Sequence, residues 1–396
     1  MNRRIAVLIA CFFTVLISYC IRYGYGVLLP DMLSSLEISR TEAGLIYSFF
    51  FIAYTIFSPL LGTLGDRYNL RLLIVIFVIV LGTGTLLMAL VSSLTQAILF
   101  FTLAGIGSAA CWAPVMALAQ RWTQDQHRGK TLAFVDIGSA LGIVISSAGL
   151  PLIVTKWDWR MGWLILGIAG LVIAAMDFSA LRNPPKKVTE LKSGGSAWTP
   201  GKTYLRLFED FRFWLLGMAY LFTGFAIIIP FTFLTTFATK ELNFAYTNAA
   251  GLVMAIGISA VAGKILLGSF SDRIRRIYIM MLCGALIAGG CAGMAYARDW
   301  MLWACVVIFG VGYGAVWAMY AASASDYFSK ELAGTVVGLW TLYLGIGSTV
   351  SPALAGWIGD RTDTLLWSFI LAAGGGIASL MLLLPIWKGS GTERTR

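Results

Sequence analysis

Gly62-Thr-Leu-Gly-Asp-Arg67 lies in the first half of the chain, and Gly268-Ser-Phe-Ser-Asp-Arg273 follows 206 residues later in the second half. Each hexapeptide comes after the second long apolar segment of its half and opens a short basic loop. A chain of 396 residues that repeats a charged loop at about half its length has the pattern of a duplicated helical bundle. We therefore expect two halves with the same internal order of segments.

The composition indicates that the long apolar segments of the chain lie in a lipid bilayer. The chain is 59% hydrophobic and 12% charged, with a mean hydropathy of +0.82. Crossing a bilayer takes about 20 apolar residues in a helix. Stretches of that length occur twelve times, and they predict helices at 5–29, 43–64, 72–91, 95–118, 131–153, 161–181, 211–238, 246–270, 277–297, 300–322, 333–355 and 364–387.

The expected fold is an all-α membrane protein with 12 transmembrane helices in two pseudo-symmetric six-helix bundles. The bundles are expected at 1–181 and 211–396. Residues 182–210 contain Asn-Pro-Pro-Lys-Lys and Ser-Gly-Gly-Ser, which are typical of a polar linker. We expect this linker to be a flexible tether on the cytoplasmic side.

The distribution of Lys and Arg predicts the orientation in the membrane. With both termini inside, the cytoplasmic loops and termini carry 21 of the 29 basic residues and the outer loops carry six. An excess of Lys and Arg in cytoplasmic loops is the usual topological signal of a membrane protein. It explains the net charge of +10 without a nucleic-acid partner, and it places both termini in the cytoplasm.

The sequence lacks the residues that several classes of active site need. The single histidine, His127, lies in a loop, and the six cysteines fall in apolar segments without metal or redox spacing. The sequence contains no phosphate-binding loop and no pattern for a nucleophile with its base. We expect no catalysis, no metal and no cofactor.

The repeated Gly-x-x-x-Asp-Arg loop resembles the signature of the major facilitator superfamily, and the resemblance extends over nearly the whole chain. It implies a monomeric secondary transporter with alternating access to one central site. It also implies that the loop residues form a charged latch between helix ends. Those residues are Gly62, Asp66, Arg67, Gly268, Asp272 and Arg273.

Two cations lie within apolar segments, where an ionisable residue is costly and usually functional. Arg22 is well inside the first helix, and Tyr19 and Tyr25, three residues to either side, share its face. Lys264 is inside the eighth helix. The only membrane carboxylates, Asp136 and Asp177, fall near helix ends, so both cations are expected to lack an acidic partner and to bind an anionic substrate.

Two subfamily resemblances suggest which anion. Arg22, eight residues before Pro30, resembles the arginine of organophosphate:phosphate antiporters. The second arginine of that family would stand at Phe222, eight residues before Pro230. Its absence argues against a doubly charged phosphate gripped by two arginines.

The second half is similar to the monocarboxylate and oxalate–formate transporter families. Their substrate-binding arginine, four residues before the loop glycine, corresponds to Lys264 before Gly268. Tyr313 is a further expected contact to the anion. Ala260 stands where human-type members have a proton-coupling aspartate. Lys264 is therefore the expected proton-coupling group, since a lysine removed from water gives up its proton more readily until an anion arrives.

The sequence thus predicts a multi-pass transporter of the cytoplasmic (inner) membrane that moves a small organic anion. A monocarboxylate such as lactate, carried together with protons, is the favoured substrate. One alternative is an anion exchanger for a phosphorylated, sulfonated or dicarboxylic compound. The other is a non-transporting anion sensor, for which the linker at 182–210 would supply the interaction surface.

Overall fold

The computed structural model describes residues 3–67, 69–124, 127–183, 207–271, 273–329 and 332–389. The first half of this part is helical throughout, apart from short turns. Its helices are α1 (Arg3–Leu36), α2 (Arg40–Arg67), α3 (Leu70–Met88), α4 (Leu94–Ser108), α5 (Ala113–Arg121), α6 (Arg128–Val154) and α7 (Trp159–Ala180).

The second half has the same character. Its helices are α9 (Phe211–Lys240), α10 (Tyr246–Ser271), α11 (Arg276–Tyr296), α12 (Asp299–Tyr327), α13 (Ala333–Thr362) and α14 (Leu366–Gly389). Within the described residues, 12 helical segments are long and apolar enough to cross a membrane, with α4 and α5 together forming the fourth. The predicted all-α membrane fold is confirmed.

Side-chain caps explain why several helices begin where they do. Ser93 accepts a hydrogen bond from the backbone of Gln96 at the start of α4, Asp158 accepts one from Met161 at α7, and Asp210 accepts one from Arg212 at α9. Such caps satisfy backbone N–H groups that have no partner within the helix. Each cap therefore fixes the point at which a spanning segment enters the apolar layer.

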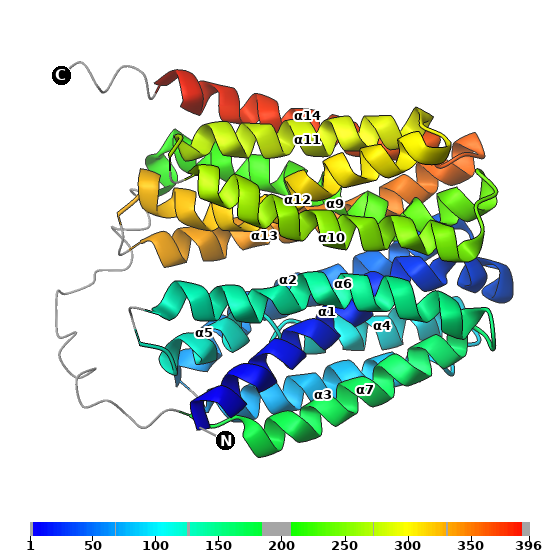
Figure 1. Ribbon diagram of the computed structural model, residues 1–396, viewed down its shortest axis with the longest axis horizontal. Helices are drawn as coiled ribbons and strands as arrows, with labels where there is room; N and C mark the ends of the chain where they lie inside the picture. Colours follow the sequence, from blue (N-terminus) through cyan, green and yellow to red (C-terminus); the bar gives the residue numbers. More distant parts are fainter. Residues whose placement is uncertain are drawn as a thin grey trace.

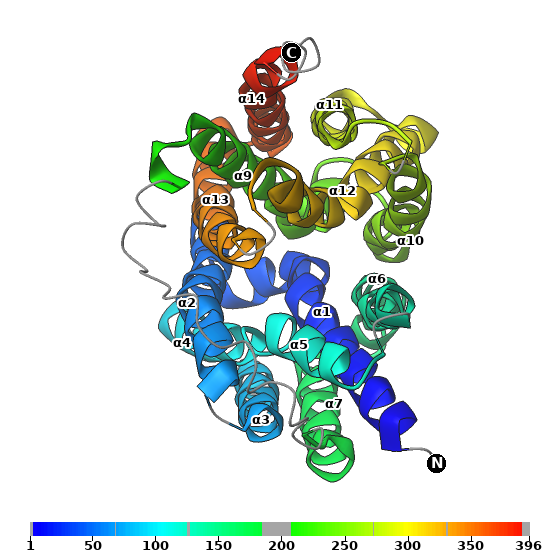
Figure 2. The same ribbon diagram turned by 90° about the vertical axis from the view of Figure 1, so that its left-hand side faces the viewer.

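The helices form two groups in space. Figure 1 shows α1 to α7 in one half of the molecule and α9 to α14 in the other. Figure 2, which looks along the helices, shows α2 beside α13 and α6 beside α10 where the groups meet. We call these groups the N bundle and the C bundle.

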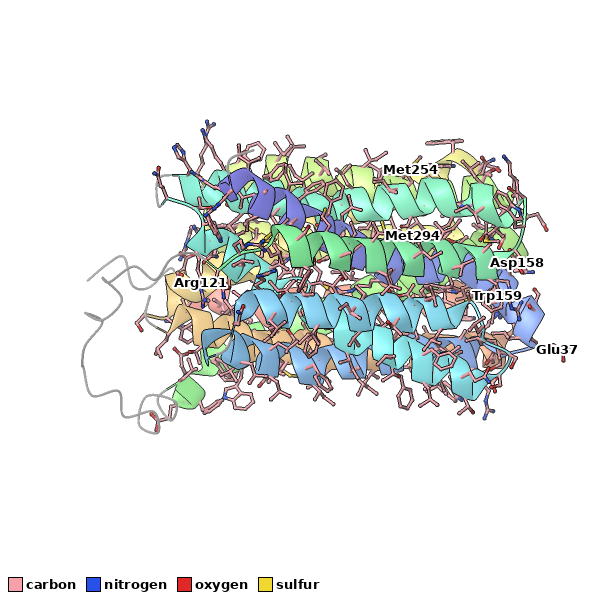
Figure 3. The ribbon with its side chains drawn as sticks, turned by 90° about the horizontal axis from the view of Figure 1, so that it is seen from below. Glu37, Arg121, Asp158, Trp159, Met254 and Met294 are labelled. Atoms are coloured by element: carbon pink, nitrogen blue, oxygen red, sulfur yellow. The ribbon has the colours of Figure 1, made fainter. Side chains whose placement is uncertain are left out.

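The two ends of the molecule differ in what they carry. α1 begins and α14 ends at the same end, which we call the terminal end (Figure 1). Figure 3 shows Arg121 near this end and Glu37 with Asp158 at the opposite end, which we call the far end. The helices alternate in direction between the two ends, so the described part of the basic turn between α10 and α11 also lies at the terminal end.

Glycines allow the two bundles to touch backbone to backbone. A Cβ on Gly26 of α1 would lie 1.9 Å from the carbonyl oxygen of Phe231 in α9. A Cβ on Gly44 of α2 would lie 2.2 Å from the carbonyl oxygen of Pro352 in α13. Small residues at helix crossings permit this close approach in membranes. The bundles are therefore in direct contact at the centre and towards the far end.

The fourth span is not the continuous helix that the sequence predicts at 95–118. α4 ends at Ser108, a turn covers residues 109–112, and α5 starts at Ala113 with Pro114 in its first turn. Proline lacks the N–H that would continue the hydrogen-bond ladder, so the helix is interrupted before it. Broken helices at membrane depth often accompany ligand sites in transporters.

Candidate anion site

Arg22 is a buried cation at the centre of the N bundle. It is 7% exposed, and one terminal nitrogen, Nη2, donates to Ser108 Oγ over 3.0 Å. Ser108 is the last residue of α4, directly before the helix break. The guanidinium Nε has no hydrogen-bond partner, and no described carboxylate lies within 4.0 Å of the guanidinium.

Aromatic rings surround this guanidinium. Its central carbon lies 4.4 Å from the ring centre of Tyr54, 5.2 Å from that of Tyr19, and 5.7 and 5.8 Å from those of Phe50 and Phe51. Ring faces attract a cation within about 6 Å, but they accept no strong hydrogen bonds. An arginine has five N–H donors in a fixed fork. The site therefore stabilises the charge while leaving donor capacity for an anion.

Tyr19 connects the aromatic rings around Arg22 to α6, which packs against α1. Its Cβ packs against Gly142 of α6, where an added Cβ would lie 2.9 Å away. The Tyr19 ring lies 5.2 Å from the central carbon of the Arg22 guanidinium. Tyr19 thus contacts both Arg22 and α6, the helix that carries Asp136.

Tyr313 reaches the same region from the C bundle. Its hydroxyl donates to the hydroxyl of Tyr23 over 3.3 Å, and its ring packs against Phe231. Tyr23 is also buried, and it lies next to Arg22 in α1. Sequence reasoning missed Tyr23. Adjacent residues of a helix do not face each other, so the sequence gives no signal that Tyr23 belongs with Arg22, and only the contact with Tyr313 across the bundle interface brings it in.

Tyr25, predicted to offer its hydroxyl to the ligand, is used elsewhere. Its hydroxyl donates to the Ala43 carbonyl over 2.7 Å, and its ring stacks on Tyr47 and Phe101. The side chain is fully buried in this aromatic stack. Tyr25 therefore joins α1 to α2 and is not brought into contact with Arg22.

Lys264 has an acidic partner, so the expectation of an unpaired lysine was wrong. Its Nζ lies 2.6 Å from Asp136 Oδ2 and 3.1 Å from Ser139 Oγ. Lys264 is on α10 of the C bundle, and Asp136 and Ser139 are on α6 of the N bundle. The sequence shows Asp136 near a helix end, but only the packing of α6 on α10 places that end beside Lys264.

The ion pair has a position suited to a conformational role. Asp136 lies in the first third of α6 and Lys264 in the last third of α10, so the pair joins the bundles on the terminal-end side. The side chains of Asp136 and Lys264 are 32% and 24% exposed, so the pair lies at the edge of the contact between the bundles and not in its core. Separation of the bundles at this end would break the pair at modest cost and free Lys264.

The repeated loops are only partly described. Gly62, Asp66 and Arg67 lie in the last turns of α2, where the backbone alone is described, and Asp272 lies outside the described residues. Gly268 has open space around it and Arg273 is exposed. The proposed latch role of these six residues stays a prediction.

Beside the second loop the structure adds a charge pair that the sequence analysis had not assigned. Arg276, at the start of α11, pairs with Asp326 near the end of α12. The signal in the sequence that could have indicated this pair is the group of basic residues after the second hexapeptide.

A polar cluster closes the far end between the bundles. Arg40, at the start of α2, lies 3.2 Å from Glu241 after α9. Asp360 of α13 accepts hydrogen bonds from the backbone N–H groups of Arg40 and Thr41, over 3.0 and 2.8 Å. A carboxylate at a helix N-terminus is favourable because it meets unpaired amides and the positive end of the helix dipole. The far end is thus held shut by contacts from both bundles.

Comparison with known proteins places this geometry in a family. The family model described as "Major Facilitator Superfamily" matches residues 11–351 and 248–394. The hexuronate transporter of Bacillus subtilis is 25% identical over 98% of this chain and 97% of its own length. Monocarboxylate transporter 12 of Xenopus laevis is 22% identical over 95% of this chain and 87% of its own. The crystal structure of the nucleoside transporter NupG has the same fold, with a TM-score of 0.79, 16% identity and coverage of 98% of this chain and 100% of that one.

Proposed function

This chain belongs to the major facilitator superfamily, and on that premise we propose that it is a secondary transporter that carries a small monocarboxylate together with protons. The observation that carries the proposal is Arg22: a buried guanidinium, stacked among aromatic rings, with no carboxylate within 4.0 Å in the described part of the chain. A cation in such a place is costly unless a ligand uses it. A carboxylate fits because it matches the planar fork of arginine.

Two relatives support an organic anion. One is named for hexuronate, which is a sugar carboxylate, and the other for monocarboxylates. The aromatic surroundings of Arg22 favour a substrate with an apolar body and one carboxylate over a strongly hydrated dianion. We propose that Tyr19, Tyr23 and Tyr313 contact the bound substrate through their hydroxyls.

The contacts that join the bundles at the two ends offer a mechanism for alternating access. We propose that the far-end cluster of Arg40, Glu241 and Asp360 separates when the carrier opens at the far end, and that the Lys264–Asp136 pair separates when it opens at the terminal end. The N bundle (1–181) and C bundle (211–396) would then rock about the central site, with 182–210 as their tether. The excess of basic residues supports a cytoplasmic terminal end in the cytoplasmic membrane.

Uptake of labelled lactate into proteoliposomes that contain the pure protein tests this function. We expect an acidic exterior to stimulate uptake and unlabelled monocarboxylates to compete. Uptake only into vesicles preloaded with phosphate, a sulfonate or a dicarboxylate would instead identify an exchanger. Binding without any flux would favour the sensor.

Substitution of Lys264 tests its predicted role as the proton-coupling group. The lysine was expected to release its proton because it lacked an acidic partner. Asp136 is such a partner, and its negative charge favours the protonated form of Lys264. Arginine stays charged and can keep the pair, so we expect Lys264→Arg to retain accumulation driven by a pH gradient. Lys264→Gln, which leaves Asp136 unpaired, should slow exchange. Exchange without pH-driven accumulation in Lys264→Arg would identify Lys264 as the proton carrier.

A further inference from the structure

A line of polar side chains runs through the interior of the N bundle along α1. Thr14, Ser18 and Arg22 are spaced four residues apart and therefore lie on one face of the helix. Their exposed fractions are 0%, 2% and 7%. Ser18 Oγ lies 2.9 Å from Ser108 Oγ, which in turn accepts from Arg22. Thr14 lies one helical turn from Ser18 on this face and forms no hydrogen bond with it, so the set consists of two hydrogen-bonded groups stacked along α1.

Asp177 of α7 stands at the other end of this line. Its side chain is fully buried, and its Oδ2 lies 2.7 Å from Thr14 Oγ1. Its Oδ1 has no hydrogen-bond partner, and no cationic group of the described chain is within 4.0 Å of the carboxyl. An ionised carboxylate without a cation or a full set of donors is very unfavourable in an apolar interior.

The two contacts of the Thr14 hydroxyl are compatible with a protonated Asp177. Thr14 Oγ1 also lies 2.9 Å from the Ala10 carbonyl oxygen, a group that can only accept. A threonine hydroxyl has one proton to donate. If that proton goes to Ala10, the contact with Asp177 requires the carboxyl to donate. The arrangement is satisfied when Asp177 is a neutral carboxylic acid.

No titratable or charged group of the described residues forms an ion pair with the carboxyl. Cys11 of α1 and Cys111 in the turn before α5 are buried free thiols. Arg71 of α3 donates to the backbone carbonyl of Phe178, and Arg182 donates to that of Leu181. These guanidinium groups therefore bind the end of α7 through its backbone and form no salt bridge with Asp177.

We propose that Asp177 is the proton-binding site of this transporter, coupled to the anion at Arg22 through the buried line of hydroxyls. This inference rests on the proposed symport function and adds the group that holds the proton. In the coupled step the Asp177 O–H bond breaks, the proton passes to water on the side where substrate is released, and the carboxylate remains. Proton uptake from the other side restores the acid.

The charge balance of the N bundle explains why the two ligands would move together. With Asp177 neutral, the buried set carries the single positive charge of Arg22, and one monocarboxylate cancels it. With Asp177 ionised, Asp177 and Arg22 cancel each other and no anion is needed. The two mixed forms leave a net charge in a low-dielectric interior, where charge is costly. Reorientation is thus favoured for the fully loaded and the fully unloaded carrier.

Asp177→Asn tests the proposal, because asparagine keeps the shape of the neutral acid but binds no exchangeable proton. In proteoliposomes with a gradient of one pH unit, one-to-one symport drives about tenfold accumulation of lactate. We expect Asp177→Asn to abolish this accumulation while lactate-for-lactate exchange continues. Asp158→Asn, which changes the capping carboxylate at the other end of the same helix, should leave accumulation unchanged.

A second readout does not depend on transport. Infrared spectra of the wild-type protein saturated with lactate at neutral pH should contain the carbonyl band of a protonated carboxylic acid, and Asp177→Asn under the same conditions should lack it. Absence of that band in the wild type, or normal accumulation in Asp177→Asn, would overturn the assignment while leaving symport intact. A wild type that exchanges lactate but shows no pH-driven accumulation would overturn symport itself.

Thr14 supplies a variant that leaves the carboxyl in place. Thr14→Val removes the hydroxyl that is hydrogen-bonded to Asp177 Oδ2 and should shift the pH at which uptake is half-maximal. Thr14→Ser keeps the hydroxyl and should leave that pH unchanged. An unchanged pH profile in Thr14→Val would contradict the proposed hydrogen bond.

Discussion

Arg22→Gln is expected to abolish saturable lactate uptake, with a loss of affinity of about 100-fold or more. Removing one partner of a buried charge pair costs about 3–5 kcal/mol, and each 1.4 kcal/mol is a factor of ten in affinity. Arg22 is 7% exposed, so little screening by water reduces this effect. Binding is measured by the shift in thermal unfolding with rising lactate concentration, and flux by uptake in proteoliposomes.

Two further variants separate recognition from folding. Arg22→Lys keeps the charge but loses the planar fork that stacks near Tyr54, so we expect weakened binding that is still detectable. Arg160→Gln removes an arginine that bonds Ser35 and the Val91 carbonyl at the far end, and it should leave affinity unchanged. Wild-type affinity in a folded Arg22→Gln protein would show that the anion binds elsewhere.

Much of the fold is predictable because a spanning helix needs a long apolar run with few charges. The ends of helices are less predictable, because tertiary contacts extend them beyond the apolar run. The first helix was expected to end near residue 29, but it continues through Pro30 to Leu36. The eleventh span was expected to end near residue 355, but it reaches Thr362, where Asp360 meets the start of α2.

One residue of the candidate site, Arg22, could be predicted from the sequence without knowledge of its neighbours. Arg22 is a lone cation in an apolar run, so composition alone singles it out. Tyr23, the partner of Lys264 and the interruption after Ser108 depend on how helices from distant parts of the chain pack. Asp177 was visible in the sequence, but the argument for a neutral carboxyl depends on its complete burial and on its contact with Thr14, which the sequence does not show.

The proposed cycle requires the far end to close, and Gly44→Ala is expected to prevent this. The added Cβ would lie 2.2 Å from the Pro352 carbonyl oxygen and 2.8 Å from the Ala353 Cα, which are backbone atoms that cannot rotate away. Overpacking of this kind costs about 1–3 kcal/mol, so the closed form should become about 5- to 150-fold rarer. We expect lactate uptake to fall at least about fivefold.

The effect of Gly44→Ala on the closure of the far end can be measured directly. Spin labels at Lys156→Cys in the N bundle and Trp300→Cys in the C bundle, in a background without the native cysteines, report the separation of two exposed far-end sites. Gly44→Ala should lengthen that distance, whereas Gly289→Ala, at an exposed position of α11 with no atom within 4 Å of the new Cβ, should not. Normal uptake and an unchanged distance in Gly44→Ala would mean that contact between α2 and α13 is not required for transport. Loss of uptake at the wild-type distance would place the defect at the anion site instead.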